Sequence, residues 1–292
     1  AGIDAGINLI DTAPIYGFGV SEQVVGRAIA DRRDQVLIAT KCGMVVGGEK
    51  GRFKTRSTAH QIDENGHLEI RIYNGPESVR QECELSLKRL GVETIDLYQT
   101  HWQEETTAYE DTMAALLDLK QQGKIRAIGV CNATAAEMRA YEQAGPLDTD
   151  QEKFSMIDRA IESDQLPHCR EKNIAMLAYS PLAMGLLTGK IGPDREFSQG
   201  DIRPSWPRFS QENRRRVADL LAAFQPIADQ HAATMAQLVI AWTIHQPGVT
   251  HALCGARDRK QALENAKAGT IDLNAEELQT MNDAIAAAGE IV

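Results

Sequence analysis

The sequence predicts an α/β protein and, within that class, a (β/α)8 TIM barrel. Short apolar segments of strand length alternate with amphipathic segments of helix length along the chain, and this alternation is typical of a parallel sheet. The 292 residues suffice for one such barrel. No Gly-x-Gly-x-x-Gly motif follows an early strand, so an open, doubly wound sheet is the less favoured alternative.

Seven segments are predicted to be strands because each is a short apolar run bounded by glycine, charge or a turn. In chain order they are 7–10, 36–41, 95–101, 125–132, 147–151, 174–179 and 249–254. Residues 1–6 resemble the last turn of a helix, so we expect a first strand and most of a helix to be missing ahead of the numbered chain. With that strand, eight strands could close into a barrel.

The segments between the strands place apolar residues at helical spacing. Ser21 is a plausible N-cap, Pro76 suits a first turn, and Gly123 suits the position after a helix end. The predicted helices begin at Ser21 and then cover 76–90, 109–122, 135–144, 165–172, 213–231, 235–245, 259–268 and 275–288. Two long loops are expected at 44–74, with a hairpin around Asn65-Gly66, and at 192–211. No linker or repeat divides the chain, so we expect one domain over 1–292.

Composition limits the class of function. The formal net charge of −10 argues against nucleic acid and anionic membranes as partners. Five scattered cysteines without a CxxC pair suggest neither a disulfide framework nor a zinc site, and favour a reducing cytoplasm. No apolar run approaches the ~18 residues of a membrane helix. The oligomeric state stays open.

Four polar residues lie at or just after predicted strand ends: Asp11, Tyr16, Lys41 and His101. In a parallel barrel these ends share one face, where the chemistry takes place. Taken singly, such an aspartate is more often a cap, such a lysine a solvated strand end and such a histidine structural. Together they form a proton donor. A lysine ammonium favours the tyrosine phenolate, the aspartate pairs with the lysine, and the histidine can hydrogen-bond a carbonyl oxygen.

Such a donor suits the reduction of a carbonyl group, because hydride addition creates an alkoxide that tyrosine can protonate. The hydride must come from a cofactor. Asn132 and Gln151 could hydrogen-bond a carboxamide, and Tyr179 could stack on a flat ring. Residues 254–265 combine a strand end, a glycine and a helix start, which attract phosphate, and Arg257 adds a bidentate donor.

Taken with these motifs, the chain resembles the aldo-keto reductases from residue 1 to about 288, in particular the bacterial NADP-dependent ones. Gly-Ile-Asn-Leu-Ile-Asp-Thr-Ala at 6–13, Ile-Gly-Val-Cys-Asn at 128–132 and Ala-Tyr-Ser-Pro-Leu at 178–182 occur in the family's order. The resemblance implies reduction of an aldehyde or ketone to an alcohol by NAD(P)H, without metal or flavin, and with Tyr16 as general acid. Asp11, Lys41 and His101 complete the tetrad, and His101 and Trp102 join Tyr16 beside the substrate.

The resemblance also implies a cofactor site. Its residues would be Asp11, Asn132, Gln151, Tyr179, Ser180, Leu182, Gly185, Leu187, Lys190, Gly255, Arg257, Gln261 and Asn265. Because a guanidinium can grip a 2′-phosphate in two hydrogen bonds, Arg257 favours NADPH over NADH. Two departures matter: Cys131 replaces the usual serine, which puts one carboxamide hydrogen bond in doubt, and the first strand lies outside the numbering.

Two other functions stay open at this point. Regulatory subunits of potassium channels share this fold and cofactor pocket, and a barrel could also bind dinucleotide without turnover. The substrate is predicted to be a polar carbonyl compound, such as an aldose, a ketose or another oxygenated ketone, because Trp102 and the two long loops should line the mouth. Those loops carry Arg52, Arg56, Arg203, Trp206 and Arg208.

Overall fold

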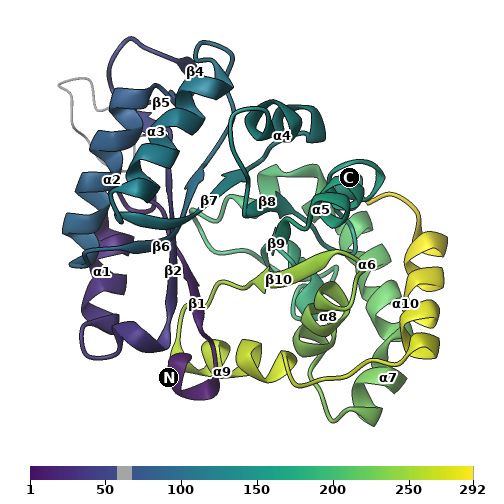
Figure 1. Cartoon of the computed structure of the whole chain (residues 1–292). Helices are drawn as coiled ribbons and strands as arrows, with labels where there is room; N and C mark the ends of the chain where they lie inside the picture. The colour runs from purple at the N-terminus through teal and green to yellow at the C-terminus, as the bar shows by residue number, and fades with distance from the viewer. Residues whose placement is uncertain (58–67, 292) are drawn as a thin grey trace. The chain divides into compact units, whose positions relative to one another are not determined.

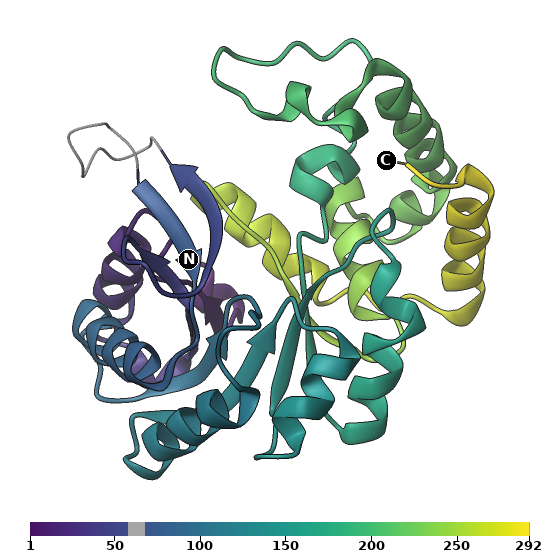
Figure 2. The same cartoon turned by 90° about the horizontal axis from the view of Figure 1, so that it is seen from above.

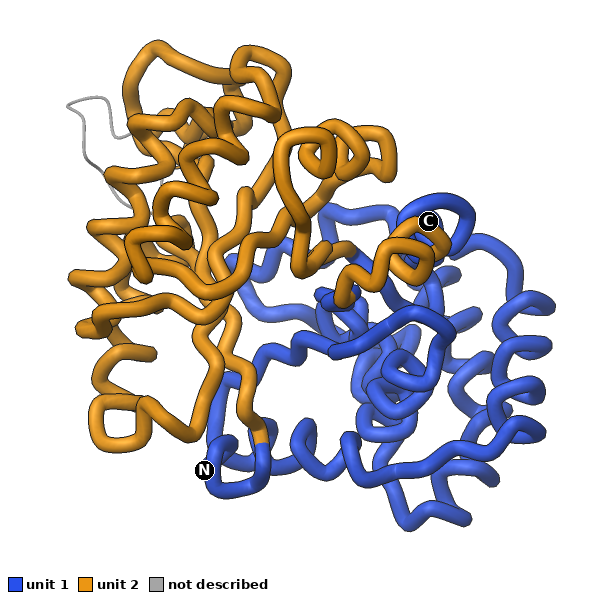
Figure 3. Tube along the Cα trace, viewed as in Figure 1, with its two compact units in different colours: residues 1–6, 153–166, 176–292 blue, residues 7–152, 167–175 orange. Residues whose placement is uncertain are grey.

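A computed structural model describes residues 1–57 and 68–291. The chain divides into two compact units, which Figure 3 shows in different colours. Unit 1 comprises residues 1–6, 153–166 and 176–292, and unit 2 comprises residues 7–152 and 167–175. The expectation of a single domain stays a prediction.

Unit 2 is built on parallel strands. They follow the order β1-β2-β6-β7-β8. Their bounds are β1 (Leu9–Asp11), β2 (Leu37–Cys42), β6 (Ile95–Thr100), β7 (Ile125–Cys131) and β8 (Thr149–Lys153). Strand β6 is buried along its length, whereas β1 is half-buried because it pairs only with β2 among the described residues. The predicted buried run at 7–10 is therefore an edge strand here.

Helices cover the outer side of these strands (Figure 1). They are α1 (Val20–Ile29), α2 (Pro76–Leu90), α3 (Tyr109–Gln121), α4 (Ala135–Glu142) and α5 (Gln165–Lys172). Helix α2 packs against β2 and α3 against β7. The stripe Val79, Cys83, Leu87 and Leu90 is buried as predicted. The prediction of Ser21 as N-cap is wrong, because Gly19 occupies the N-cap position of α1 with φ +92°. The hydroxyl of Ser21 instead forms a hydrogen bond with the hydroxyl of Thr12, with the two oxygens 2.8 Å apart.

The prediction of a long loop at 44–74 is wrong over most of the described part of this segment. Strands β3 (Met44–Val46), β4 (Arg52–Ser57) and β5 (Leu68–Ile72) form an antiparallel sheet in the order β3-β5-β4, and Figure 2 shows β4 and β5 side by side. The missed signal is the alternation in β5, where buried Leu68, Ile70 and Ile72 alternate with half-exposed polar residues. The hairpin turn predicted at Asn65-Gly66 lies outside the described residues.

Unit 1 contains the parallel pair β9 (Ala175–Tyr179) and β10 (Val249–Leu253). Its helices are α6 (Gln211–Ala223), α7 (Gln225–Gln230), α8 (Met235–Ile244), α9 (Arg259–Ala268) and α10 (Ala275–Ala288). Most of α8 is buried, and Trp242 stacks on Phe154 with ring centroids 5.8 Å apart. The single helix predicted over 213–231 is two helices, because Pro226 lacks an amide donor and starts a new first turn after Phe224.

Strand and helix positions otherwise agree with the predictions to within a few residues. Helices 76–90, 165–172, 259–268 and 275–288 have the predicted bounds. The segment 192–211 is irregular apart from two short 3-10 turns, at Arg203–Ser205 and Pro207–Phe209. Among the described residues, no helix has the length and apolar character needed to cross a membrane.

Candidate active site

A buried ion pair forms the centre of the candidate site in unit 2. Lys41 Nζ donates to both carboxylate oxygens of Asp11, at 2.7 and 2.6 Å, and to the carbonyl of Thr12 at 3.0 Å. Gln151 Nε2 also donates to Asp11, at 2.9 Å. The Lys41 side chain is only 1% exposed. Lys41 is therefore no solvated strand end, and its charge is compensated within the fold.

The strand register places these groups together. Asp11 ends β1 opposite Ala39 of β2, and Lys41 lies two residues further along β2, on the same face. Burial opposes the charge of Lys41, but the Asp11 carboxylate and neighbouring groups outweigh it and raise the pKa of Lys41 above its usual 10.5. Lys41 is thus a permanent cation at neutral pH.

Tyr16 and His101 lie beside this pair. Their rings meet edge to face, with centroids 5.8 Å apart, and Lys41 Nζ is 5.3 Å from the Tyr16 ring centroid. Tyr16 is 42% exposed, so an incoming molecule can reach its ring. Burial raises the pKa of Tyr16 above 10 and outweighs the opposing effect of Lys41. The expected lowering by Lys41 is therefore present, but it does not dominate.

His101 follows β6 and is buried. Burial, together with the positive charges of Lys41 and Lys54, lowers its pKa to about 3. The imidazole is therefore neutral at physiological pH and can donate a hydrogen bond through only one ring nitrogen. It can orient a carbonyl oxygen by a hydrogen bond, but a neutral imidazole is too weak an acid to serve readily as the proton donor.

Two amide side chains lie next to this group. Asn132, with φ +54°, donates from Nδ2 to the carbonyl of His101 at 2.9 Å. Its backbone N–H donates to the carbonyl of Gln151 at 3.1 Å. These contacts join the ends of β6, β7 and β8, so the structure brings together all six site residues predicted in this unit at strand ends: Asp11, Tyr16, Lys41, His101, Asn132 and Gln151.

Sequence reasoning missed a second buried amide that supports this arrangement. Gln103 Nε2 donates to the carbonyl of Cys131 at 3.0 Å, and the Tyr141 hydroxyl donates to Gln103 Oε1 at 2.9 Å. Burial raises the pKa of the Cys131 thiol well above its usual range, so this residue is a neutral thiol beside Lys41. Nothing in the sequence around Gln103 signals this role.

A pair of buried acids flanks Gln151 on β8 and was also missed. Asp150 and Glu152 lie on the opposite strand face, and the backbone N–H of Ala133 donates to Glu152 at 2.6 Å. Burial, then the proximity of the two carboxyls, raises the pKa of Asp150 well above its usual range. Burial raises the pKa of Glu152 to about 7. The pair therefore retains a proton near neutral pH.

Beside Trp102 lies a lysine that the sequence did not single out. Lys54 of β4 places Nζ 3.2 Å from the centroid of the Trp102 indole. Arg52, two residues earlier, donates to the carbonyl of Gln103 at 3.0 Å. The small antiparallel sheet thus brings positive charge to the segment that follows His101.

The remaining predicted cofactor residues belong to unit 1. Tyr179 ends β9, and the turn after it uses left-handed backbone at Ser180 and Gly185, with φ +58° and +92°. Leu182 is half-buried, Leu187 is buried, and exposed Lys190 lies 3.6 Å from Glu264. Unit 1 also holds Trp206, exposed, Arg208, which donates twice to Asp158, and Arg203, paired with Asp201.

The start of α9 has the features expected of a phosphate site. Arg257 is exposed, and its side chain has no partner in the described part of the chain. Its backbone N–H donates to Gln261 Oε1 at 3.0 Å, and Asn265 Nδ2 donates to the carbonyl of Gly255 at 3.2 Å. Asp258 caps the helix. A Cβ built on Gly255 would meet no atom within 4 Å, so space is open beside this helix start.

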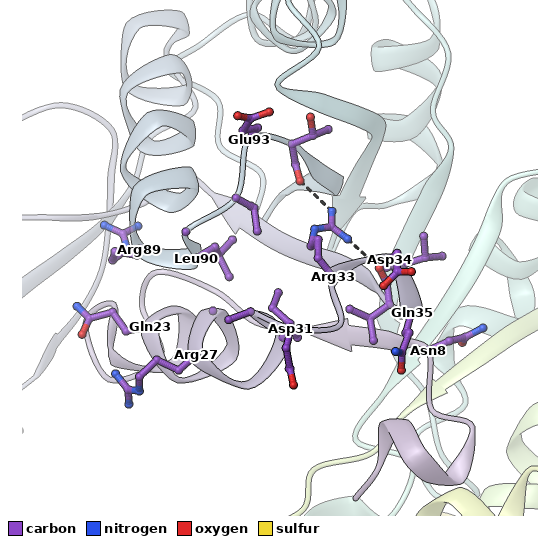
Figure 4. A pocket seen from close by; sticks show the side chains of 18 of the residues that line it. Asn8, Gln23, Arg27, Asp31, Arg33, Asp34, Gln35, Arg89, Leu90 and Glu93 are labelled. Carbon is purple, nitrogen blue, oxygen red and sulfur yellow. Dashed lines mark hydrogen bonds between the residues drawn. The ribbon is translucent and has the colours of Figure 1, made fainter.

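A separate cavity of about 1380 Å³ lies in unit 2 at the N-terminal ends of the parallel strands, opposite to the ends that carry the candidate site (Figure 4). It is lined by α1, the end of α2 and the segment 30–37. Arg33 crosses it to the carbonyl of Thr94 at 2.9 Å and to Asp96 at 2.6 Å. Because it opens at the N-terminal ends of β2 and β6, and no tetrad residue lines it, this cavity is not the candidate active site.

Comparison with known proteins finds a matching family and similar proteins. The model of the Aldo/keto reductase family matches residues 1–286. An Escherichia coli protein named NADH-specific methylglyoxal reductase is 42% identical over 273 residues, which is 92% of this chain and 80% of that protein.

Two solved structures are similar over nearly the whole chain. The glycerol dehydrogenase AKR11B4 from Gluconobacter oxydans has a TM-score of 0.88 and 35% identity, covering 99% of this chain and 84% of that one. An aldo/keto reductase from Klebsiella pneumoniae in complex with NADP and acetate has a TM-score of 0.70 and 28% identity, covering 97% and 81%.

Proposed function

The chain belongs to the aldo/keto reductase family, and we propose that Tyr16 is the proton donor of its reaction. Membership confirms the predicted (β/α)8 barrel class and the predicted activity: the protein is an oxidoreductase that reduces carbonyl groups with a nicotinamide cofactor. Family membership does not assign the roles of individual residues, the preference between NADPH and NADH, or the substrate. We propose these from the site and from the similar proteins.

The neutral state of His101 supports Tyr16 as the acid. With a pKa of about 3, His101 carries no extra proton at pH 7, whereas the phenol of Tyr16 stays protonated because its pKa is raised. The nicotinamide, when bound, supplies the hydride. As charge develops on the carbonyl oxygen, the Tyr16 hydroxyl gives it a proton and His101 orients it by a hydrogen bond.

Lys41 and Asp11 assist this proton transfer. The Lys41 ammonium stabilises the phenolate that Tyr16 leaves behind, and the two hydrogen bonds from Lys41 to Asp11 hold the ammonium in place. Asn132 and Gln151 are proposed to bind the carboxamide. Their own contacts with His101 and Asp11 connect cofactor binding to the position of the acid.

We propose NADPH as the preferred cofactor. Support comes from Arg257, an exposed guanidinium ahead of α9, with Arg259 and Lys260 exposed beside it. A 2′-phosphate offers this cluster two negative charges that a ribose hydroxyl lacks. The relative from Escherichia coli is named NADH-specific, so titration of both cofactors by fluorescence quenching is the direct test of the preference.

The proposed substrate is a small oxygenated carbonyl compound. The polar and aromatic groups around Trp102 support it, and the names of two relatives, a methylglyoxal reductase and a glycerol dehydrogenase, refer to three-carbon oxygenated molecules.

The five free cysteines are compatible with the cytoplasm, which we propose as the compartment.

Replacement of one tyrosine tests the proposed role. Tyr16→Phe should lower kcat for methylglyoxal reduction by roughly 10²- to 10⁴-fold, because phenylalanine cannot donate a proton. The dissociation constant of NADPH should stay within about twofold. Tyr109→Phe on α3, whose hydroxyl hydrogen-bonds to Glu137 at 3.2 Å, is the matched control and should retain full activity. A Tyr16→Phe variant with more than half of the parent kcat would exclude Tyr16 as the acid.

A further inference from the structure

Lys54 occupies an unusual position in unit 2. It belongs to β4 of the small antiparallel sheet, yet its Nζ lies 3.2 Å from the indole centroid of Trp102, the residue directly after His101. Its positive charge also contributes to the lowered pKa of His101, together with Lys41. Lys54 is therefore close enough to influence the group that orients the carbonyl oxygen.

Two hydrogen bonds hold this contact between Lys54 and Trp102 in place. Arg52 Nη2 donates to the carbonyl of Gln103 at 3.0 Å, and Asn74 Nδ2 donates to the carbonyl of Trp102 at 2.9 Å. Asn74 follows β5, the partner strand of β4. The sheet is thus fastened at two points to the segment after His101, and this limits how far Lys54 can move from it.

Lys54 has no acidic partner in the described part of the chain, unlike its basic neighbours. Arg56 and Arg71 of the same sheet pair with Glu69, and Arg52 lies 3.8 Å from Glu105. Across residues 1–57 and 68–291, by contrast, no carboxylate lies within ion-pair distance of Lys54. Burial and the neighbouring Arg52 lower its pKa. The Trp102 ring attracts the ammonium but supplies no counter-charge.

We propose that Lys54 selects carbonyl substrates that carry an anionic group, a carboxylate or a phosphate, and binds that group beside Trp102. This inference rests on the proposed function and names the substrate class of the same site. The carbonyl oxygen points to Tyr16 and His101, while the anion meets Lys54. An anion there provides the counter-charge that no residue of 1–57 or 68–291 supplies, and Lys41 cannot compete for it because Asp11 already neutralises Lys41.

The test compares charged and neutral aldehydes in matched pairs. Succinic semialdehyde and its methyl ester give the carboxylate arm, and glyceraldehyde 3-phosphate and glyceraldehyde give the phosphate arm. Each is assayed with NADPH in the parent enzyme, Lys54→Met, Lys54→Arg and Lys50→Met. Lys50 is the matched control, because it also lies over an aromatic ring, 5.7 Å from the centroid of Tyr73, but contacts no site residue among those described.

The parent enzyme should prefer the charged member of at least one pair by about 10-fold or more in kcat/KM, as expected for a charge-assisted contact. Lys54→Met should abolish that preference by raising KM for the charged member alone, and Lys54→Arg should restore much of it. Lys50→Met should behave as the parent. Which arm shows the preference identifies carboxylate or phosphate. The dissociation constant of NADPH should not change in any variant.

Three results would overturn the proposal. Equal activity of the parent on charged and neutral members leaves carbonyl reduction intact but removes the role of Lys54. An equal loss on both members in Lys54→Met would indicate that Lys54 only supports Trp102. Weaker NADPH binding in Lys54→Met would indicate a role toward the cofactor. Absence of turnover with every aldehyde would instead contradict the proposed function, and the inference would fail with it.

Discussion

Replacement of Lys41 by methionine tests whether the site depends on a buried ion pair. The substitution keeps the length of the side chain and removes its charge. It eliminates two hydrogen bonds to Asp11, at 2.7 and 2.6 Å, and one to Thr12 at 3.0 Å. Asp11 then retains the hydrogen bond from Gln151 Nε2 at 2.9 Å. We therefore expect both stability and activity to fall.

The magnitude follows from the burial of the pair. The side chains of Lys41 and Asp11 are 1% and 15% exposed, so water can only partly replace the lost ammonium. Breaking a buried pair on one side costs about 3–5 kcal/mol, because a carboxylate is left without its counter-charge. An exposed pair would contribute roughly 0–1 kcal/mol. These two ranges do not overlap, so the measurement discriminates between them.

Urea unfolding at pH 7, followed by circular dichroism, measures the change in unfolding free energy. The double variant Asp11→Asn/Lys41→Met is the essential control, because it also removes the orphaned charge. It should recover much of the loss, and the double-mutant cycle isolates the interaction between the two residues. A loss below about 1 kcal/mol in Lys41→Met, or a double variant that is less stable than either single one, would refute the buried pair. An unchanged pH–rate profile would remove Lys41 from the proton transfer.

Two further predictions concern other charges. Arg257→Ala should weaken NADPH binding by roughly 10- to 150-fold, the range for a charge-assisted hydrogen bond, and should leave NADH nearly unchanged; an equal loss for both cofactors would show that Arg257 does not read the 2′-phosphate. For the acid pair, the folded protein keeps a proton that the unfolded chain releases, so the unfolding free energy should fall as pH rises from 4.5 to 7, by up to about 3 kcal/mol for Glu152. Asp150→Asn should make this fall shallower, and parallel pH curves for variant and parent would contradict it.

Local patterns predicted most of the elements. Helix α2 has the predicted bounds because Pro76 starts it and Gly91 follows it, and its apolar stripe is buried. The break at Phe224 could have been predicted from Pro226. The antiparallel sheet was overlooked because a stretch rich in glycine and charge obscured the alternation in β5. Its strands depend on each other for hydrogen bonds, so the local signal in each is weak.

Strand periodicity and short motifs are local properties of the chain, so they were enough to predict the family and the α/β class, which are confirmed, and a candidate tetrad, which stays a prediction. The charge states of the site residues, by contrast, depend on how the chain folds. Burial makes His101 neutral, outweighs Lys41 in raising the pKa of Tyr16, and keeps a proton on Asp150 and Glu152. Folding also places Lys54 against Trp102, although 48 positions separate them in the sequence. Desolvation and long-range contacts depend on which surfaces the folded chain removes from water, and no local pattern encodes that.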